Sequence, residues 1–316
     1  MQNKHIEHPE DSILTGDLSV LDWMCDSDSF ISVKIDGAPA IVWGRNPANG
    51  KFFVGTKSVF NKVKIKINHS HEEIDTNHSG KVASILHACF DSLPRTSFIY
   101  QGDFIGFGGD DTYRPNTITY KFPEVIGQSV IIAPHTEYTL NKWQEKNAKE
   151  LHKIHKNILR FVVAQPVSKQ FDDTLDVKWV QPEAAICPYR DDIEDFCKFA
   201  KQMASLVEFV NVKKAQKITQ VLNRYIREGE SIDYVAQYDI ASECECDVNL
   251  IRFWSLVQSI KMDLLCFVER EDDIKCYIND QQTDHEGYVM VNEFGMFKIV
   301  DRQHFSRLNF TIAKDW

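Results

Sequence analysis

The tetrapeptide Lys34-Ile35-Asp36-Gly37 places an amine, a carboxylate and a glycine directly after a short apolar stretch typical of a buried strand. A lysine at the end of such a strand is unusual, because lysine is rarely buried without a partner. Its amine is a nucleophile only after losing a proton, which at pH 7 and a pKa of about 10.4 costs roughly 4.6 kcal/mol. Burial and a nearby cation such as Mg²⁺ would lower this pKa, and Gly37 would let the backbone approach a phosphate. The alternative interpretation of Lys34 is a surface lysine at a β-turn.

Three later segments carry residues that could act together with Lys34. Asp103 follows Gly102 in a strand-like segment, Glu286 precedes an apolar run, and Lys298 comes 12 residues after Glu286 in another apolar run. The chain therefore has two amines and two carboxylates on four segments that each resemble a short β-strand.

This order of segments resembles the covalent nucleotidyltransferase superfamily, which includes ATP-dependent DNA and RNA ligases and mRNA capping enzymes. The likeness begins with KIDG at 34–37 and FVGTKS at 53–58, continues with YQGD at 100–103, and ends with EG at 286–287 and FKIV at 297–300. The segments from KIDGAPAIVWG to KIVDRQHFSRLNF are also similar to uncharacterised ligase-like proteins of tailed phages. The likeness covers roughly residues 30–135 and 275–302.

The resemblance implies a role for each matched side chain. Lys34 would attack the α-phosphate of ATP, expel pyrophosphate and hold AMP as a phosphoramidate, while Mg²⁺ or Mn²⁺ neutralises the developing charge. Glu286 would contact this metal or orient the amine. Lys298 would contact the α-phosphate as a fixed cation, and Asp103, where the family usually has glutamate, would hydrogen-bond the ribose hydroxyls. Lys57 would reach a phosphate or a nucleic-acid strand.

Five further residues are expected at the nucleotide on the same basis. Ile35, Asp36 and Gly37 would line the nucleotide site beside the nucleophile. Tyr120 and Phe122 are the candidates for an aromatic ring stacked on adenine.

Two positions depart from the family pattern and need substitutes. The family often has arginine five residues after the nucleophile, where this chain has Pro39, so Arg45 or Lys57 would take over its contact. The last motif usually has a second lysine, where this chain has Val300, and Arg302 is the nearest candidate substitute.

Residues 51–66 carry five lysines and no acidic residue. In a chain with a formal net charge of −10, this local concentration indicates contact with a nucleic-acid backbone. The alternative is a solvated hairpin. The expected nucleic-acid-binding residues are Lys51, Lys57, Lys62, Lys64 and Lys66.

Composition bounds the class of protein. The chain has 316 residues, of which 43% are hydrophobic and 26% charged, as in folded globular proteins of one or two domains. The acidic net charge argues against a protein that coats nucleic acid over its whole surface, but a local basic groove remains compatible. The sequence contains no run of about 18 apolar residues, so it does not predict a membrane span. The eight cysteines form no C-x-x-C pair and no secretion signal precedes them, so we expect reduced thiols in a cytoplasm, that of the host cell if the protein is phage-encoded.

The distribution of patterns predicts an α+β fold. Short strand-like segments fill residues 30–135 and 275–302, and between them helical spacing prevails in 142–161, 191–227 and the helix after Asp247. The resemblance implies that 1–140 and 272–316 form a nucleotidyltransferase (adenylation) core with ATP-grasp-like antiparallel sheets. The segment 141–271 would be a mostly helical insertion and a candidate substrate clamp. No C-terminal OB barrel is expected.

These inferences favour an ATP-dependent polynucleotide ligase that joins 5′-phosphate and 3′-hydroxyl ends of RNA or DNA through a lysine–AMP intermediate and an adenylated 5′ end. Its expected cofactors are ATP and Mg²⁺ or Mn²⁺, and its expected partner is nucleic acid, with no membrane and no obligate protein partner indicated. Two alternatives stay open: a GTP-using capping-type nucleotidyltransferase, and a non-catalytic phage protein that binds nucleotide or nucleic acid with a relic site.

Overall fold

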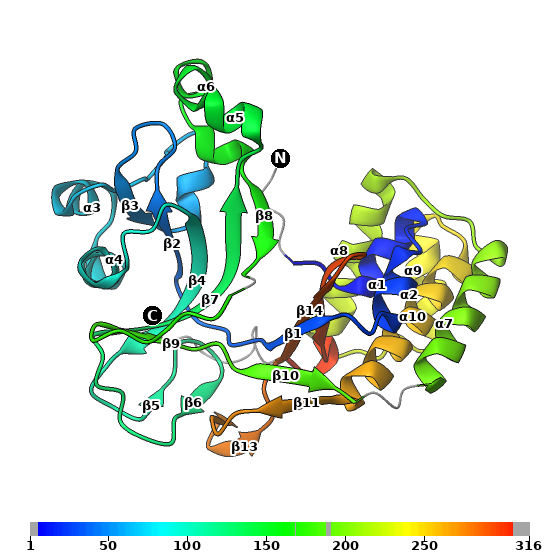
Figure 1. Ribbon diagram of the computed structural model, residues 1–316. Helices are drawn as coiled ribbons and strands as arrows, with labels where there is room; N and C mark the ends of the chain where they lie inside the picture. The colour runs from blue at the N-terminus through cyan, green and yellow to red at the C-terminus, as the bar shows by residue number, and fades with distance from the viewer. Residues whose placement is uncertain (1–5, 168, 188–190, 306–316) are drawn as a thin grey trace.

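The computed structural model describes residues 6–167, 169–187 and 191–305, which form a mixed α+β fold (Figure 1). The α-helices and the short 3-10 helices (η) are α1 (Pro9–Ser12), η1 (Ile13–Thr15), α2 (Ser19–Cys25), η2 (Lys57–Phe60), α3 (His71–Asn77), α4 (Gly80–Ser92), α5 (Lys142–Lys146), α6 (Ala148–His155), η3 (Ile158–Phe161), α7 (Asp191–Met203), η4 (Ala204–Leu206), α8 (Val212–Glu228), α9 (Tyr234–Cys244) and α10 (Val248–Cys266). The strands are β1 (Phe30–Val33), β2 (Ala40–Arg45), β3 (Phe52–Gly55), β4 (Ile99–Phe107), β5 (Thr112–Tyr113), β6 (Thr119–Lys121), β7 (Val130–Thr139), β8 (Val163–Pro166), β9 (Val177–Trp179), β10 (Glu183–Ile186), β11 (Val268–Glu271), β12 (Lys275–Ile278), β13 (Gln281–Thr283), β14 (Gly287–Asn292) and β15 (Gly295–Val300).

The strands form three sheets. The first has the order β11-β10-β1-β14-β15, the second β3-β2-β4-β7-β8 with β9 parallel to β7, and the third β13-β12-β6-β5. All pairings apart from that of β9 are antiparallel in these sheets. The predicted α+β class with antiparallel sheets is therefore confirmed.

The first sheet uses strand alternation to separate a packed face from a polar face. Ile31 pairs with Met290, which pairs with Phe297, and all three pack into the helical core. The next row, Ser32 with Val289 and Lys298, faces the opposite way and lines a cavity. Because successive side chains of a strand point to opposite faces, the register that buries the apolar row also aims the second row at the cavity.

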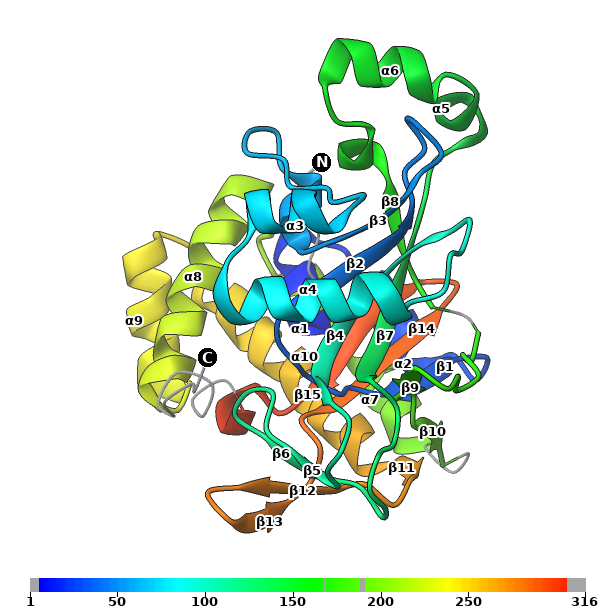
Figure 2. The ribbon, with the colours of Figure 1, turned by 90° about the vertical axis from the view of Figure 1, so that its left-hand side faces the viewer.

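Two groups of helices lie on opposite sides of the molecule, and α5 and α6 stand apart from both (Figures 1 and 2). Helices α7 to α10 pack on the first sheet together with α1 and α2 from the beginning of the chain, in one apolar cluster. Helix α4 covers the second sheet, where Ile85 and Leu86 pack against its strands. The sequence pattern indicated helices in the segments that form α5 to α8 and α10, but helices α3 and α4 lie in a zone for which only strands were expected.

Segment 141–271 contains the helices α5 to α10 and also supplies β8, β9, β10 and β11 to two of the sheets. Conversely, the helices of residues 9–25 belong to the helical group and not to the strands of the expected core. Residues 306–316, assigned to that core, lie outside the described residues.

No barrel follows β15 in the residues up to 305. Among the described helices, none combines the length and the apolar character needed to cross a membrane.

Candidate functional site

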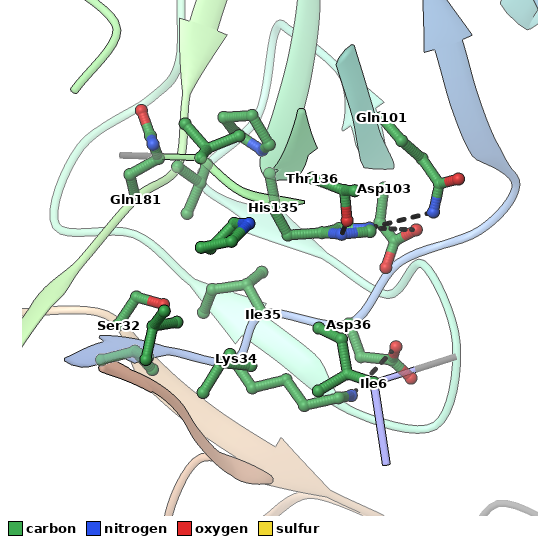
Figure 3. Close-up of a pocket in the computed structure, with 18 of the residues that line it drawn as sticks. Ile6, Ser32, Lys34, Ile35, Asp36, Gln101, Asp103, His135, Thr136 and Gln181 are labelled. Atoms are coloured by element: carbon green, nitrogen blue, oxygen red, sulfur yellow. Dashed lines mark hydrogen bonds and ion pairs between the residues drawn. The ribbon is translucent and has the colours of Figure 1, made fainter. Parts of the chain in front are cut away.

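A cavity of about 180 Å³ lies between the first and the second sheet (Figure 3). One wall comes from β1, the residues that follow it, β14 and β15, and includes Lys34, Ile35 and Lys298. The other wall comes from β4 and β7 and includes Asp103 and His135. The cavity therefore gathers residues from the beginning, the middle and the end of the chain.

Lys34 leaves β1 opposite the start of β14. Its backbone N–H donates to the carbonyl of Gly287 at 2.8 Å, which brings Glu286 next to it. The Lys34 amine donates a hydrogen bond to Glu286 Oε2 and lies 3.2 Å from Asp36 Oδ1. The Lys34 side chain is only 15% exposed, so this amine and its two carboxylates form a largely buried ion cluster.

The two carboxylates decide the protonation of Lys34. Burial acts to lower the pKa of the Lys34 amine, but the negative charges of Asp36 and Glu286 and the hydrogen bond to Glu286 outweigh it and raise this pKa above its usual value. Burial was expected to lower the pKa, and this expectation was incomplete because it left out the carboxylates. In the protein alone, the amine is held as an ammonium ion.

Lys298 shows the opposite behaviour. Burial and the positive charge of Lys34 lower the pKa of the Lys298 amine to about 8, against the attraction of Glu286 and Asp36. The backbone N–H of Lys298 donates to the carbonyl of Glu7 at 3.1 Å, so the first described residues flank β15 on its outer edge. The site thus contains two lysines that differ in their readiness to lose a proton.

Asp36 and Gly37 are held by the loop between β5 and β6 and by β4. Asn116 donates to Asp36 Oδ2 at 2.6 Å, and the Gly37 N–H donates to Asp103 Oδ2 at 3.5 Å. A Cβ on Gly37 would lie 2.5 Å from the carbonyl oxygen of Phe104, which no real contact allows. Glycine is therefore required here by the close approach of β4, whatever ligand binds.

The wall opposite Lys34 carries a polar cluster (Figure 3). His135 Nε2 lies 3.7 Å from Asp103 Oδ1 and 3.4 Å from Gln101 Nε2, and His135 Nδ1 lies 2.6 Å from Thr136 Oγ1. This cluster offers both donors and acceptors to a ligand that lies between the sheets.

A second, more open hollow of about 380 Å³ adjoins the cavity and shares Asp36, Lys57 and Asp103 with it. The cavity alone is smaller than the roughly 300 Å³ at which ligand pockets usually begin, but the adjoining hollow extends the space. Three lysines and two carboxylates line the combined space, namely Lys34, Lys57, Lys298, Asp36 and Asp103, and a third carboxylate, that of Glu286, is bonded to Lys34. Their formal charges cancel, so an anionic ligand would need to bring a counter-ion or displace an existing ion pair.

Comparison with known proteins places the chain in a family. The model of DUF6267, described as a family of unknown function, matches residues 3–314. The chain belongs to this family. No curated protein and no solved structure matches the chain.

In this DUF6267 protein, three of the residues expected at the nucleotide lie elsewhere. Arg45 is exposed at the far end of β2, five residues beyond Ala40, which lines the open hollow. Phe122 is buried in the apolar core beside the third sheet. Arg302, the suggested substitute for a second lysine, is buried and donates to Glu10 at 3.0 Å. The structure therefore does not bring these three residues to the cavity.

Tyr120 lies next to the site, but its ring does not line the cavity. The ring is fully buried, and the hydroxyl accepts from the Asp36 N–H at 2.9 Å and donates to the Asp36 carbonyl at 3.2 Å. Tyr120 therefore fixes the backbone beside Lys34 and is not placed to stack on a base in the cavity.

The five lysines of residues 51–66 do not form one surface at the cavity. Lys57 lines both hollows, and Lys51 lies at the opposite end of β3. Lys62 and Lys64 are exposed in the loop after η2, and the Lys66 amine donates to the Asn77 carbonyl. Their binding of nucleic acid stays a prediction, with Lys57 the member placed at the cavity.

His135, Gln101, Thr136 and Asn116 were missed by sequence reasoning. The one available signal was the segment 130–139, in which the polar pair His135-Thr136 interrupts an apolar strand and thereby indicates a strand that faces a polar space. Nothing local marked Asn116, whose contact with Asp36 spans 80 residues.

Replacing Tyr120 by phenylalanine is expected to lower the free energy of unfolding by about 0.5–1.5 kcal/mol, because the part-buried hydrogen bond of the Asp36 N–H is lost. Urea denaturation of the variant would measure the loss. Tyr277→Phe on neighbouring β12 is the control, since no described hydrogen bond depends on its hydroxyl. Equal stabilities of both variants would show that the Tyr120 hydroxyl does not hold Asp36.

Proposed function

We propose that this protein is an ATP-dependent polynucleotide ligase that uses Lys34 as the nucleophile. The observation that carries the proposal is the meeting of Lys34 and Lys298 at a cavity whose other wall holds Asp103, with Glu286, 252 residues from Lys34 along the chain, bonded to the Lys34 amine. A structural ion pair needs one amine and one carboxylate. Here a second amine, that of Lys298, lies beside this ion cluster at the cavity, and its charged form is poorly stabilised. Such a perturbed group at a cavity is typical of a functional site.

The proposed first step joins Lys34 to AMP. The Lys34 Nζ forms a bond to the α-phosphorus of ATP, the bond from this phosphorus to the pyrophosphate oxygen breaks, and pyrophosphate leaves. The ammonium ion must first lose a proton, and Glu286 is its hydrogen-bonded acceptor. Burial raises the pKa of the Glu286 carboxyl despite the attraction of Lys34, which favours this transfer. The AMP then passes to a 5′-phosphate end, and a 3′-hydroxyl displaces it.

The expected Mg²⁺ or Mn²⁺ has a compatible set of ligands. In the described residues, no group of three or more His, Cys, Asp or Glu side chains gathers to hold a metal by itself. Magnesium, however, is commonly bound by one or two carboxylates together with substrate phosphates. Asp36 would supply one such carboxylate throughout, and Glu286 would supply a second while it carries no proton. The ion would offset the phosphate charge and lower the pKa of the Lys34 amine.

The wall opposite Lys34 would receive the nucleoside. Asp103 and His135 form the polar side of the cavity, suited to ribose hydroxyls or to the edge of a base. Lys57, which borders both hollows, would face phosphates or the incoming end of the substrate strand.

Incubation with labelled ATP or GTP and Mg²⁺, followed by intact-mass analysis, tests this function. A ligase should form an acid-labile AMP adduct, and a sealing assay with nicked and single-stranded DNA, RNA and hybrid substrates should then identify the substrate. A GMP adduct would replace the proposal by the capping-type alternative. The absence of any adduct would leave the non-catalytic binding protein, which the ammonium state of Lys34 in the protein alone favours.

Lys298 gives this reaction a specific dependence on pH. With a pKa of about 8, the Lys298 amine is a cation below pH 8 and loses its charge above it. We therefore expect kcat/KM for adenylation to fall as the pH rises through 8. Arginine stays charged across this range, so Lys298→Arg should move the fall to higher pH even if it lowers the maximal rate. Lys275→Arg, at an exposed site, is the control, and an unchanged alkaline limb in Lys298→Arg would exclude this role of Lys298.

A further inference from the structure

The connection between β7 and β8, residues 141–160, stands out from the sheets as a small helical arm (Figures 1 and 2). This arm contains α5, α6 and the beginning of η3. It carries six basic and two acidic side chains, a net charge of +4 in a chain whose total is −10. The arm is therefore an isolated basic feature on an acidic protein.

The basic side chains of the arm are available to a partner. Lys149, Lys153 and Lys156 are exposed; the first two lie one turn apart on the same side of α6, and Lys156 follows as the C-cap residue of this helix. Within the described residues, only Lys153 of these three pairs with a carboxylate, that of Glu150 at 2.8 Å. From Lys149 to Lys153 the helix rises roughly 6 Å at 1.5 Å per residue, about the length of two nucleotides at 3.4 Å each, and Lys156 follows at the end of the helix.

An aromatic ring lies on the same arm. Trp143 in α5 is 64% exposed, and in the described part of the chain its indole packs against no other aromatic ring. A large exposed indole among lysines is the combination that binds single strands, since the ring stacks on a base of any sequence while the lysines contact phosphates.

The arm is attached to the rim of the cavity. It begins three residues after Tyr138 and ends six residues before Pro166, and both of these residues line the cavity. Asn157 is buried and donates to the carbonyls of Val59 and Asn61 at 2.8 and 2.9 Å. These bonds fasten the arm to the loop that carries two further exposed lysines, Lys62 and Lys64.

The turn between β2 and β3 also reaches the arm. Ala48 in this turn packs against Leu140, Ala148 and Ile158. Arg45 and Lys51, which the structure keeps away from the cavity, border this turn and add two exposed positive charges beside the arm.

We propose that the arm of residues 141–160 is a binding site for a nucleic-acid strand. Lys149, Lys153 and Lys156 contact consecutive phosphates, and Trp143 stacks on a base. In naming the bound strand as the substrate whose end enters the cavity, the proposal rests on the proposed ligase function.

Fluorescence anisotropy with a labelled single-stranded oligonucleotide, without ATP, tests the arm across a range of salt concentrations. The test variant is K149E/K153E/K156E. The matched control K198E/K213E/K275E makes the same change of total charge at exposed lysines of α7, α8 and β12. Thermal unfolding of both variants would verify that the folds are intact.

We expect the arm variant to bind about ten-fold more weakly or worse. We also expect the slope of log K against log salt to lose about two units, at roughly 0.7 per phosphate contact in single strands. In the control variant, the affinity and the salt slope should each change by no more than half as much as in the arm variant. Equal effects of the two triple variants, or no measurable binding by the wild type at low salt, would overturn the proposal.

Substitutions of Trp143 distinguish the contribution of base stacking from that of the lysine charges. W143A should weaken binding by at least about five-fold, whereas W143F should restore most of the affinity because phenylalanine retains a stacking face. Wild-type affinity in W143A would show that the ring takes no part, and would reduce the site to its lysines.

Adenylation distinguishes failure of this inference from failure of the proposed function. If the AMP adduct forms normally in K149E/K153E/K156E while binding falls, both proposals hold. If the adduct forms but the arm variant binds as the control does, the arm proposal alone fails. If the wild type binds through the arm but forms no adduct, the arm stands and the ligase function fails.

Discussion

Replacing Lys34 by arginine should abolish formation of the AMP adduct while leaving the fold intact. The guanidinium of arginine keeps the positive charge that Asp36 and Glu286 need, but it stays protonated and cannot attack phosphorus. Alanine at this position would leave two carboxylates without their cation in a largely buried site, and the resulting instability could be mistaken for lost chemistry. Intact-mass analysis after incubation with ATP and Mg²⁺ would measure the loss.

Lys57→Arg is the informative control for the Lys34 experiment, because Lys57 borders the same space but is not expected to bond to AMP. It should still form the adduct. An adduct that persists in Lys34→Arg would show that another nucleophile acts. Lys298, whose amine loses its proton near pH 8, would then be the first residue to examine by peptide mapping.

Replacing Glu10 by glutamine should lower the free energy of unfolding by about 3–5 kcal/mol, because it leaves the buried Lys261 without its counter-charge and Arg302 with Asp11 alone. Glu10 and Lys261 are fully buried, and Glu10 Oε1 accepts from Lys261 at 2.8 Å and from Arg302 at 3.0 Å. Arg302 also donates to Asp11 at 2.9 Å, so this network joins the beginning of the chain, α10 and the residues after β15. Urea denaturation at pH 7 would measure the loss.

Two comparisons sharpen the Glu10 experiment. Lys201→Met breaks the ion pair between Lys201 and Asp22, whose side chains are 41% and 45% exposed, and should cost no more than about 1 kcal/mol. The double variant Glu10→Gln/Lys261→Met removes one cation together with the carboxylate and should recover part of the loss. Similar losses for Glu10→Gln and Lys201→Met would show that the buried network contributes little to stability.

The Glu10 network also predicts that the stability of the fold depends on pH in the acidic range. Burial alone would raise the pKa of the Glu10 carboxyl, but Lys261 and Arg302 outweigh it and hold this pKa well below its usual 4.5. The stabilisation is thus fully present above pH 4.5 and is lost as the pH falls below it, because the unfolded chain then takes up the proton. The difference in stability between wild type and Glu10→Gln should therefore narrow below pH 4.5.

Local patterns in the sequence were sufficient to predict most of the strands around the cavity. The short apolar runs of β1, β14 and β15 marked them as strands, and Asp247 marked the start of α10, where its side chain accepts from the Asn249 N–H. The approach of Lys34, Glu286 and Lys298 followed from the resemblance in motif order, not from periodicity or composition.

The errors arose where a short distance in sequence was taken as a short distance in space. Arg45 is close to Lys34 along the chain, but a strand advances about 3.3 Å per residue, so β2 carries Arg45 roughly 16 Å beyond Ala40. Arg302 follows Lys298 by four residues, yet β15 ends before it and the chain turns toward Glu10. Its partner lies 292 residues away, and no local pattern can indicate such a contact.

The order of strands in the first sheet constrains when this protein can acquire its site during synthesis. Strand β1 pairs only with β10 and β14 in that sheet, so a ribosome that has made the first half of the chain has released Lys34 on a strand with two open edges. Open edges invite pairing with other chains, and contacts between remote segments form slowly. The nascent chain therefore depends on its own last strands for protection, and a truncated product that ends before β14 should be prone to aggregate.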